Sequence, residues 1–493
     1  MTEERAVGRL SLSLAANRLP YDRSAVSPGI VHLGVGAFFR AHIAVYVDDI
    51  LATDPSWGIT GVSLRRPDTR EALAPQDFLY TVAVRSGSGV ETRIIGSLLD
   101  VLDATTQRDE ILAAMADPQI RIVSLTVTEK GYCHDPATGA LDAAHPDIVH
   151  DIAHPDAPVS APGLIVRALE LRRMAGTAPF TVLCCDNLPS NGQTAARVVT
   201  GVAQLRNADL ADYVRREVAF PSTMVDRIVP ATTDRDRELV LEATGLRDAW
   251  PVIAEPFTQW VIEDRFTAGR PPFENAGAEL VNDVRAHELT KLRMLNGSHS
   301  MLAYLGYLAG YQHVDEAIAD DALRTLISGF MSEEVMPMLS GDAVDRGAYR
   351  DALIARFSNP ALKHRTWQIA MDGSQKLPQR LLGTIRDRIA RGLPVTRGAL
   401  GVAAWMRYVT GIDELGGPID VKDPMAGQLR AIADAAGGSP EKLVRGLLGV
   451  AEIFGDDLPQ SPVFVSVLTQ HLVSLFENGA LRTADSVNQR ARG

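Results

Sequence analysis

The feature that most limits the fold of this chain is a change of pattern near its middle. Over residues 27 to 284, short β-branched runs alternate with longer helical patterns, as in βαβ units built around a parallel sheet. After residue 287 the strand signals fade, and amphipathic helices are separated by turns that contain Gly and Pro. The sequence therefore predicts an α/β domain over residues 1–285 and a mostly α-helical domain over residues 286–493.

Five runs are predicted to be strands of the parallel sheet because they are short and almost continuously apolar. This pattern is typical of strands that helices cover on both faces. The runs are residues 30–36, 59–64, 120–127, 180–185 and 223–230. The segment 134–158 contains His145, His150 and His154, is polar and rich in Pro, and is predicted to be a loop. A solvated loop explains its composition without a metal ion.

Composition excludes several classes of protein. The 493 residues carry 49 Lys and Arg against 61 Asp and Glu, a formal charge of −12, and no basic block that would suit nucleic acid. Cys133, Cys184 and Cys185 offer neither a disulfide framework nor zinc-type spacing. The first twenty residues lack the continuous apolar h-region of a signal peptide, and no later stretch approaches about 18 uninterrupted apolar residues. We expect a cytoplasmic protein with no nucleic-acid or membrane partner and no metal; the oligomeric state is left open, a monomer included.

The first predicted strand ends in a glycine turn. Gly34 and Gly36 stand between that strand and a helical pattern that starts at Ala37. A dinucleotide site needs a tight strand-to-helix turn and a residue without Cβ where the backbone nears the pyrophosphate. Phe39 replaces the third glycine of G-x-G-x-x-G, so an ordinary turn is the alternative. The place of the turn in the first βαβ unit favours a cofactor site, with Arg40 as a candidate cation for the phosphate.

The second predicted strand ends in charged residues that bear on the choice of cofactor. An acidic group at this place binds the 2′-hydroxyl of NAD, whereas an arginine accommodates the 2′-phosphate of NADP. The sequence has both kinds, in Arg65, Arg66 and Asp68. We predict NAD on the basis of Asp68; NADP and an exposed turn of mixed charge remain alternatives.

The strongest chemical pattern is HELTKLRMLNGSH, residues 287–299. On a helical wheel of about 100° per residue, Lys291, Asn296 and His299 share a stripe with leucines. An unpaired buried polar group costs about 1–3 kcal/mol, so three of them within nine residues favour an active site over three separate structural roles.

These residue types suit hydride transfer to or from a secondary alcohol. A lysine takes the hydroxyl proton if its pKa falls from about 10.4 towards about 7–8, and amides stabilise the alkoxide. Asn296 is a candidate amide and His299 a candidate for orienting the substrate. Glu288 is either a proton relay or an i, i+3 ion-pair partner of Lys291. Because the sequence has neither Cys/His zinc ligands nor a Tyr followed four residues later by Lys, a metal-free lysine mechanism remains.

Other candidates follow predicted strands or lie late in the chain. Asn187 is a second alkoxide donor or a turn residue, and Lys130 lies at the carboxyl edge of the sheet. Asp226 stands in a strand run, as a functional group or as part of a structural ion pair. Arg365 and Lys376 are candidates for holding an anionic or polyhydroxylated substrate, with helix-surface ion pairs as the alternative.

Motifs along nearly the whole chain resemble one family. They are GVGAFFRAH, TEKGY, CDN, TMVDRIVP, EPFTQWVIED, KLRMLNGSH and MDGSQKLPQR. By these motifs the chain is identified as a member of the mannitol dehydrogenase family, the long-chain polyol and mannonate dehydrogenases. The resemblance implies a Rossmann-type N-terminal domain, a helical C-terminal domain, an active site between them, and NAD(P) without metal.

The resemblance also implies roles for matching residues. Lys291 resembles the general base, Asn187 and Asn296 the oxyanion-type pair, His299 the substrate-orienting residue and Glu288 the proton-channel glutamate. From the residues themselves, the candidate cofactor contacts are Gly34, Gly36, Ala37, Phe38, Arg40 and Asp68, and the candidate substrate contacts are Lys130, Asp226, Arg365 and Lys376. Phe39 departs from the family pattern, which usually has His there.

Two substrate classes of this family compete. TEKGY and KLRMLNGSHS resemble the fructuronate reductases, whereas mannitol 2-dehydrogenases tend to have TEGGY and KLRLLNASH. A sugar acid needs a local cation, for which Lys130 is a candidate, because a net charge of −12 repels anions. We therefore expect D-mannonate and D-fructuronate ahead of D-mannitol and D-fructose. A non-catalytic dinucleotide sensor is a remote alternative, since it needs no polar stripe on residues 291–299.

Overall fold

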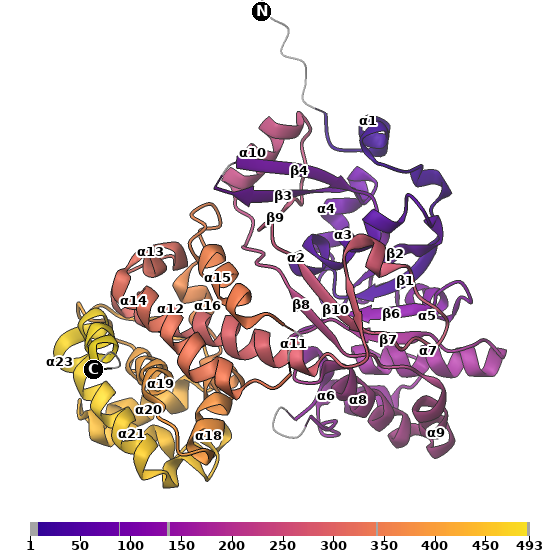
Figure 1. Ribbon diagram of the computed structural model, residues 1–493. Helices are drawn as coiled ribbons and strands as arrows, with labels where there is room; N and C mark the ends of the chain where they lie inside the picture. The colour runs from indigo at the N-terminus through magenta and orange to yellow at the C-terminus, as the bar shows by residue number, and fades with distance from the viewer. Residues whose placement is uncertain (1–7, 88, 136–138, 342–343, 491–493) are drawn as a thin grey trace, which may run out of the picture. The chain divides into compact units, whose positions relative to one another are not determined.

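The computed structural model describes residues 8–87, 89–135, 139–341 and 344–490. The chain forms two compact units, Met1–Arg285 and Ala286–Gly493, which we describe separately. Within the described residues, every strand lies in the first unit and the second unit is helical (Figure 1). The predicted fold class, a Rossmann-type parallel sheet followed by a helical region, is confirmed.

A five-stranded parallel sheet organises the first unit. Its strands are β1 (Pro28–Leu33), β2 (Gly58–Ser63), β5 (Leu98–Asp103), β6 (Ile122–Leu125) and β7 (Thr181–Cys184), in the order β5-β2-β1-β6-β7. In register, Ile30 of β1 lies between Ile59 of β2 and Ile122 of β6. The chain passes from β1 to β2 on one side and later to β6 on the other, so the strand order reverses between β1 and β6. In α/β sheets ligands bind at such a reversal.

Both faces of this sheet are buried, which explains its continuous apolar runs. Val31 and Leu33 of β1 belong to a core on one face, together with residues of α5 (Arg108–Ala116), α7 (Ala161–Ala175), α8 (Asn191–Arg206) and α9 (Ala208–Glu217). Ile30 belongs to the core on the opposite face, together with α3 (Ile43–Ile50) and Trp260. The other α-helices of the unit are α1 (Leu12–Ala15), α2 (Ala37–Ala41), α4 (Asp68–Leu73), α6 (Pro146–Ala153) and α10 (Asp234–Thr244).

Two small sheets depart from the predicted strand set. The predicted strand 223–230 shortens to β8 (Thr223–Asp226), which pairs antiparallel with β10 (Gln259–Glu263) and lies beside β11 (Glu279–Val281) in the order β11-β10-β8. The predicted assignment of this strand to the parallel sheet is therefore wrong. The sequence suggested it because Val225 is buried in the same core as Trp260, which gives β8 the apolar pattern of a central strand. The other small sheet has the order β4-β3-β9, formed by β3 (Tyr80–Ser86), β4 (Gly89–Ile95) and β9 (Val252–Ala254).

The predicted loop 134–158 is partly helical. Residues 136–138 lie outside the described residues, but α6 begins at Pro146, where proline is well tolerated in the first turn of a helix. His145 caps this helix, since its Nδ1 accepts a hydrogen bond of 3.2 Å from the backbone N–H of Asp147. The loop prediction is therefore wrong for residues 146–153, since its composition hid a proline-initiated helix.

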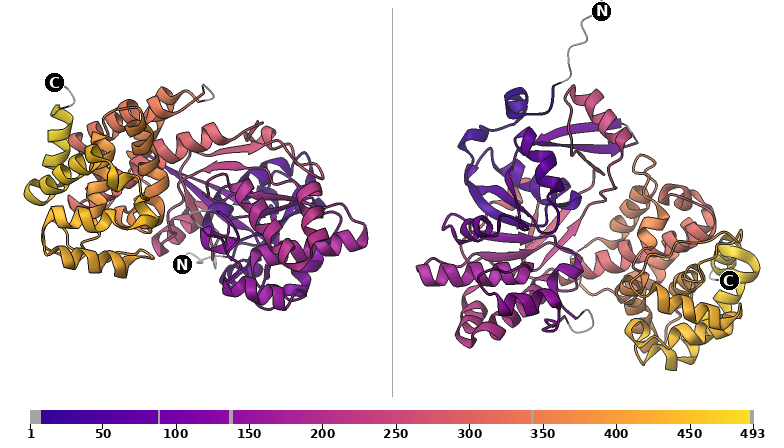
Figure 2. Two further views of the ribbon diagram at one scale, coloured as in Figure 1. Left: turned by 90° about the horizontal axis from the view of Figure 1, so that it is seen from below. Right: turned by 180° about the vertical axis from the view of Figure 1, so that it is seen from behind.

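The second unit, coloured from salmon to yellow in Figure 2, is helical. It is built around two buried helices, α12 (Gly297–Leu308) and α19 (Thr396–Tyr408). A π-helical segment, Lys291–Asn296, joins α11 (Arg285–Thr290) to α12. The other helices are α13 (Val314–Ala319), α14 (Asp321–Gly329), α15 (Arg346–Phe357), α16 (Thr366–Ala370), α17 (Gly373–Leu377), α18 (Gly383–Ala390), α20 (Ala426–Ala436), α21 (Pro440–Leu448), α22 (Ala451–Phe454) and α23 (Pro462–Arg490). None of the helices in the described ranges has the length and apolar composition that crossing a membrane requires.

Candidate active site

A cavity of about 450 Å³ opens at the carboxyl ends of β1, β2 and β6. Its lining includes residues from three turns: residues 34–36 after β1, residues 63–66, 68 and 69 at the end of β2, and residues 126–128 after β6. The strand order reverses at this place, so the cavity occupies the position where a sheet of this topology binds a nucleotide.

The two glycines of the first turn have different surroundings. Gly34 has φ +98°, and a Cβ on it would lie 2.2 Å from the carbonyl oxygen of Thr126. Only glycine fits there, because the end of β1 contacts the backbone that follows β6. A Cβ on Gly36 would meet nothing within 4 Å, and Gly36 lines the cavity. The turn thus combines a packing glycine with one that leaves space for a ligand, which fits the dinucleotide prediction.

The residues after the glycine turn point elsewhere. Phe39 is fully buried and stacks on His32 with ring centroids 3.7 Å apart. Phe38 stacks on His42 at 4.9 Å. Arg40 is 5% exposed, donates to the carbonyl oxygen of Trp250 and lies over the Tyr80 ring, and burial lowers its pKa to about 10. Neither Ala37 nor Phe38 nor Arg40 is a lining residue of the cavity. The placement of Arg40 favours a structural role over the predicted phosphate contact.

The opposite end of the cavity carries both signs of charge. Arg65, Arg66 and Asp68 all line it. Asp68 begins α4, and its carboxylate accepts a hydrogen bond of 2.9 Å from the N–H of Thr69. The guanidinium of Arg65 lies 3.8 Å from the carboxylate of Asp147, at the margin of the same cavity. A ribose at this end would meet the acid expected for NAD together with two arginines.

Asn187 lies on a loop that the side chains of two neighbouring residues hold. It is exposed and stands three residues after Cys184, the last residue of β7. The carboxylate of the preceding Asp186 accepts from the N–H groups of Val127 and Thr128, at 2.9 and 3.0 Å, and from Tyr132, at 2.8 Å. Burial raises the pKa of Asp186 to about 6. Asp186 therefore ties this loop to the segment that follows β6. The sequence did not indicate this role, and the CDN motif that contains Asp186 was its only signal.

On its other side the same loop is held by Asn191. The amide of this buried residue donates to the carbonyl oxygens of Asp186 and Thr223, at 3.0 and 2.9 Å, and accepts from the N–H of Thr223. Asn191 therefore fixes the loop to β8. No sequence pattern indicates this role, because an Asn in the first turn of a helix has many other uses.

The predicted substrate residues of the first unit differ in burial. Lys130 is exposed on a short 3₁₀ turn, Glu129–Tyr132, and is not among the lining residues of the cavity. Asp226 is 3% exposed at the end of β8, opposite Gln259. Its neighbour Arg227 donates to the backbone carbonyl of Glu255, which is a structural contact.

The predicted base lies in an unusual helix. Lys291 is 6% and His299 8% exposed, while Asn296 and Glu288 are half-buried. The wheel of 100° per residue is wrong for residues 291–296, which form a π-helix with i→i+5 bonding that brings residue 296 over residue 291. The sequence has no mark for this wider turn. Single-turn π-segments inside α-helices occur frequently at functional sites.

Close packing places a cation beside this helix. A Cβ on Gly297 would lie 2.8 Å from the carbonyl oxygen of Arg380, which belongs to a second π-helical segment, Pro378–Leu382. The guanidinium of Arg380 donates to the hydroxyl of Ser300 at 3.1 Å. Gly297 therefore permits the two segments to approach so closely that Arg380 contacts Ser300, the residue after His299 on α12.

The imidazoles of the buried His299 and the half-buried His364 lie side by side. Their ring centroids are 4.9 Å apart, and Phe357 lies 5.2 Å from His299. Burial, followed by the positive charges of His364, Arg380, Arg356 and Lys376, lowers the pKa of His299 well below 6.5. Burial and Lys376 lower the pKa of His364 to about 4. Nε2 of His299 and Nδ1 of His364 have no hydrogen-bond partner among the described residues, so both are available to a ligand.

Not every predicted cation joins this group. Lys376 donates to the carbonyl oxygen of Met371 at 2.6 Å and is close enough to affect both histidines. Arg356, which the sequence did not single out, is 8% exposed. Arg365 is exposed at the start of α16 and is not one of the charges that lower the pKa of His299.

Comparison with known proteins assigns both units to one family. Residues 28–275 match the model of the mannitol dehydrogenase Rossmann domain, and residues 283–476 match that of the mannitol dehydrogenase C-terminal domain. The chain belongs to the mannitol dehydrogenase family. The family predicted from the motifs is thereby confirmed, and the protein is an oxidoreductase of that family.

Individual members of the mannitol dehydrogenase family resemble this chain over nearly its full length. The D-mannonate oxidoreductase of Escherichia coli is 48% identical over 95% of this chain and 97% of its own. The uncharacterized oxidoreductase YeiQ of the same organism is 49% identical over 93% of this chain and 94% of its own. The solved ternary complex of Pseudomonas fluorescens mannitol 2-dehydrogenase with NAD and D-mannitol is 39% identical, with a TM-score of 0.91 over 98% of this chain and all of that one.

Proposed function

We propose that this protein is an NAD-dependent D-mannonate oxidoreductase, which interconverts D-mannonate and D-fructuronate. The observation that carries the proposal is the charge around His299, since three cations, Arg356, Lys376 and Arg380, are close enough to depress its pKa. A carboxylate forms charge-assisted hydrogen bonds with such cations, whereas the hydroxyl groups of a neutral polyol form weaker ones. The similarity to a D-mannonate oxidoreductase over 95% of the chain supports the same choice.

NAD is proposed as cofactor from the cavity and from the family. Gly36 leaves open space at the switch point of the sheet, and Asp68 lines the end where a ribose hydroxyl would bind. The related mannitol 2-dehydrogenase was solved with NAD, which supports this cofactor. When bound, NAD supplies the nicotinamide ring that exchanges a hydride with the carbon of the secondary alcohol.

The residues of the second unit would handle the proton. In the oxidation direction we assign to Lys291, as a neutral amine, the removal of the hydroxyl proton, and to Glu288 its relay to solvent. We assign to the amide of Asn296 a hydrogen bond to the oxygen as it gains negative charge, and Asn187 remains a candidate second donor from the sequence. In the reduction of the ketone the same groups act in reverse, and Lys291 returns the proton.

The two imidazoles and the cations would hold the rest of the substrate. The free ring nitrogens of His299 and His364 provide hydrogen bonds to hydroxyl groups, since both rings are neutral near pH 7. Arg380 and Lys376 are assigned to the carboxylate. Lys130, Asp226 and Arg365 remain candidate substrate contacts from the sequence.

The second candidate function is mannitol 2-dehydrogenase, with D-mannitol and D-fructose as substrates. It is favoured by the TM-score of 0.91 to an enzyme of that name. It leaves the cations around His299 without a role in recognition, and for that reason it ranks second.

Substitution of one cation discriminates between the two substrate classes. In Arg380→Gln we expect kcat/KM for D-mannonate to fall about ten- to hundredfold, since a hydrogen bond to a charged group contributes about 1.5–3 kcal/mol. Activity on D-mannitol, measured by NADH absorbance, should change much less. Arg430→Gln on α20 is the matched control, because Arg430 forms an exposed pair with Asp434. Equal losses on both substrates would contradict the carboxylate assignment.

A further inference from the structure

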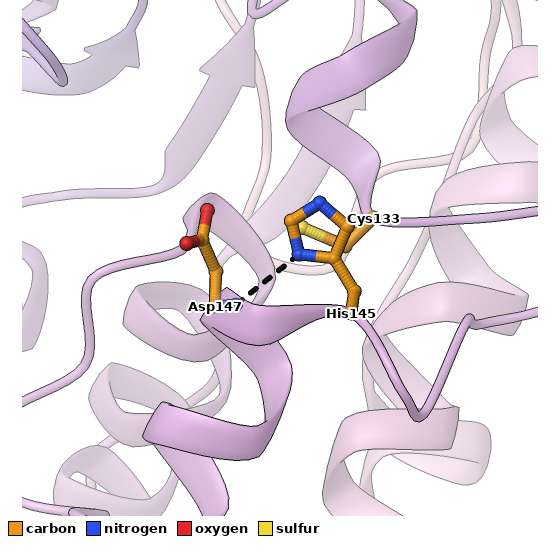
Figure 3. A group of neighbouring side chains, drawn as sticks. All are labelled: Cys133, His145 and Asp147. Carbon is orange, nitrogen blue, oxygen red and sulfur yellow. Dashed lines mark hydrogen bonds between the residues drawn. The ribbon is translucent and has the colours of Figure 1, made fainter.

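We propose that Cys133, His145 and Asp147 form a binding site for a thiophilic divalent cation such as Zn²⁺, separate from the residues assigned to hydride transfer. One ligand atom of each residue lies within 4.8 Å of the other two. In Figure 3 the sulfur of Cys133 lies against the imidazole of His145, and the carboxylate of Asp147 stands beside the same ring. The proposal does not depend on the identity of the substrate.

The fold brings these residues together from two segments. Cys133 ends the 3₁₀ turn that follows β6, and His145 and Asp147 begin α6. Twelve positions separate the cysteine from the histidine, which matches no common zinc spacing, so the sequence alone did not indicate the group. Pro146 and the hydrogen bond from the N–H of Asp147 to Nδ1 of His145 fix the start of the helix and therefore the two side chains on it.

The donor set suits a borderline-soft cation. Thiolate, imidazole and carboxylate are the ligands that Zn²⁺ takes in proteins, and three of them leave a fourth position for water. The thiol of Cys133 is 3% exposed, and no hydrogen bond to its sulfur is present within the described ranges. The side chain is therefore buried beside an imidazole and a carboxylate without a polar contact of its own.

The electrostatic field around the thiol also favours a cation. The carboxylates of Asp147, Asp151 and Asp142 act on the buried thiol of Cys133, and the guanidinium of Arg65 opposes them. Carboxylates that disfavour a thiolate attract a metal ion placed at the same point. On binding, the thiol releases its proton to solvent as the sulfur–metal bond forms, so one proton leaves for each ion bound.

His145 can supply its ligand atom at a small cost. Its Nδ1 accepts only one hydrogen bond, of 3.2 Å, which lies at the long end of the normal range. The metal would take this lone pair in place of the N–H of Asp147, while Nε2 keeps its hydrogen. Asp147 also lines the cavity of about 450 Å³ and lies 3.8 Å from Arg65, so an occupied site would draw this carboxylate away from Arg65 at the margin of the cavity.

Metal titration of the full-length protein tests the site. The protein is stripped of metal with a chelator and titrated with Zn²⁺ against a chromophoric indicator, and with Co²⁺ while the thiolate-to-cobalt charge-transfer absorption is recorded. We expect one ion per chain, one proton released per ion, and the charge-transfer band. In Cys133→Ser and His145→Asn the affinity for Zn²⁺ should fall by at least about tenfold, and Cys133→Ser should lack the band.

The variants are chosen so that a folding defect cannot imitate the result. Asparagine is a good helix N-cap, so His145→Asn keeps an acceptor for the start of α6. His154→Asn is the matched control, because it removes a histidine at the other end of α6 that is outside the proposed site. His154 packs on His150 with ring centroids 4.8 Å apart, and these two histidines are the alternative place where Zn²⁺ would bind. Loss of Zn²⁺ binding in His154→Asn, unchanged binding in His145→Asn and Cys133→Ser, or a cobalt complex without the charge-transfer band would overturn the proposal.

Discussion

The glycine turn after β1 gives a prediction that separates folding from cofactor binding. Gly34 and Gly36 are two residues apart, yet a Cβ on Gly34 would lie 2.2 Å from the carbonyl oxygen of Thr126, whereas a Cβ on Gly36 would meet no atom within 4 Å. We therefore expect Gly34→Ala to damage the fold and Gly36→Ala to damage the binding of NADH, each with little effect on the other property.

The magnitudes follow from the local geometry. At φ +98° alanine adopts a left-handed conformation at a cost of about 1–2 kcal/mol, and the forced contact with Thr126 adds about 1–3 kcal/mol. A loss of about 2–5 kcal/mol lowers the melting temperature of a unit of this size by about 4–20 °C. Gly36 has an extended backbone at the start of α2, where alanine costs less than about 1 kcal/mol.

The assay compares melting temperature and NADH affinity in the two variants. A methyl group on Gly36 projects into the cavity, and we expect the dissociation constant of NADH, followed by its fluorescence, to rise at least about tenfold, or 1.4 kcal/mol. Gly34→Ala should melt earlier and, at a temperature where it is folded, bind NADH nearly as well as the parent. If Gly36→Ala binds NADH normally, the cavity is not the cofactor site and the reasoning fails.

Three further predictions concern the base, the cofactor and acid stability. Lys291→Ala should lower kcat by at least about 100-fold, the usual contribution of a general base, while NADH affinity is unchanged; loss of NADH binding instead would show that the lysine has another role. Asp68→Ala should raise the preference for NADPH over NADH, measured as a ratio of kcat/KM values, by about tenfold, because Arg65 and Arg66 remain to meet a 2′-phosphate. His364 has a folded pKa of about 4 against 6.5 when unfolded, so the unfolded chain binds more protons between these values and stability falls as the pH drops from 6.5 towards 4. His364→Gln should flatten that dependence in unfolding experiments by up to about 1.4 kcal/mol per pH unit; an unaltered slope would contradict the burial of a neutral imidazole.

The parts of the fold that sequence predicts well are those in which the local pattern has one explanation. Residues 30–33 are buried on both faces of the sheet, and their apolar run predicted β1. β8 has the same kind of run for a different reason, since it is enclosed by Trp260 in a separate sheet, and no property of residues 223–226 distinguishes the two cases. β5 was missed because Asp100 and Asp103 interrupt its apolar residues.

The site shows the same division. Lys291 and His299 were expected to be buried because they share one stripe of the helix with leucines, and both are buried. The π-helical turn between them depends on packing against the second π-helical segment, which lies more than 80 residues later in the chain, and so has no local signal. Arg356 and the loop anchor Asp186 were missed for the same reason, since their partners are distant in sequence.

Arg40 shows what spacing along the sequence leaves open. Its position one turn after the glycine turn suggested a phosphate contact, but its guanidinium is held by Trp250 and Tyr80, from segments about 210 and 40 residues away. Spacing along the sequence placed the residue correctly on the helix without indicating which way its side chain points.

We propose that this member of the mannitol dehydrogenase family oxidises a sugar acid with NAD. The most direct measurement is kcat/KM of the purified full-length protein for D-mannonate and for D-mannitol, with NAD and NADH absorbance as the readout. We expect D-mannonate to be the better substrate by at least about tenfold, the equivalent of one charged hydrogen bond. A preference for D-mannitol, or no turnover of either compound by protein that binds NADH, would contradict it.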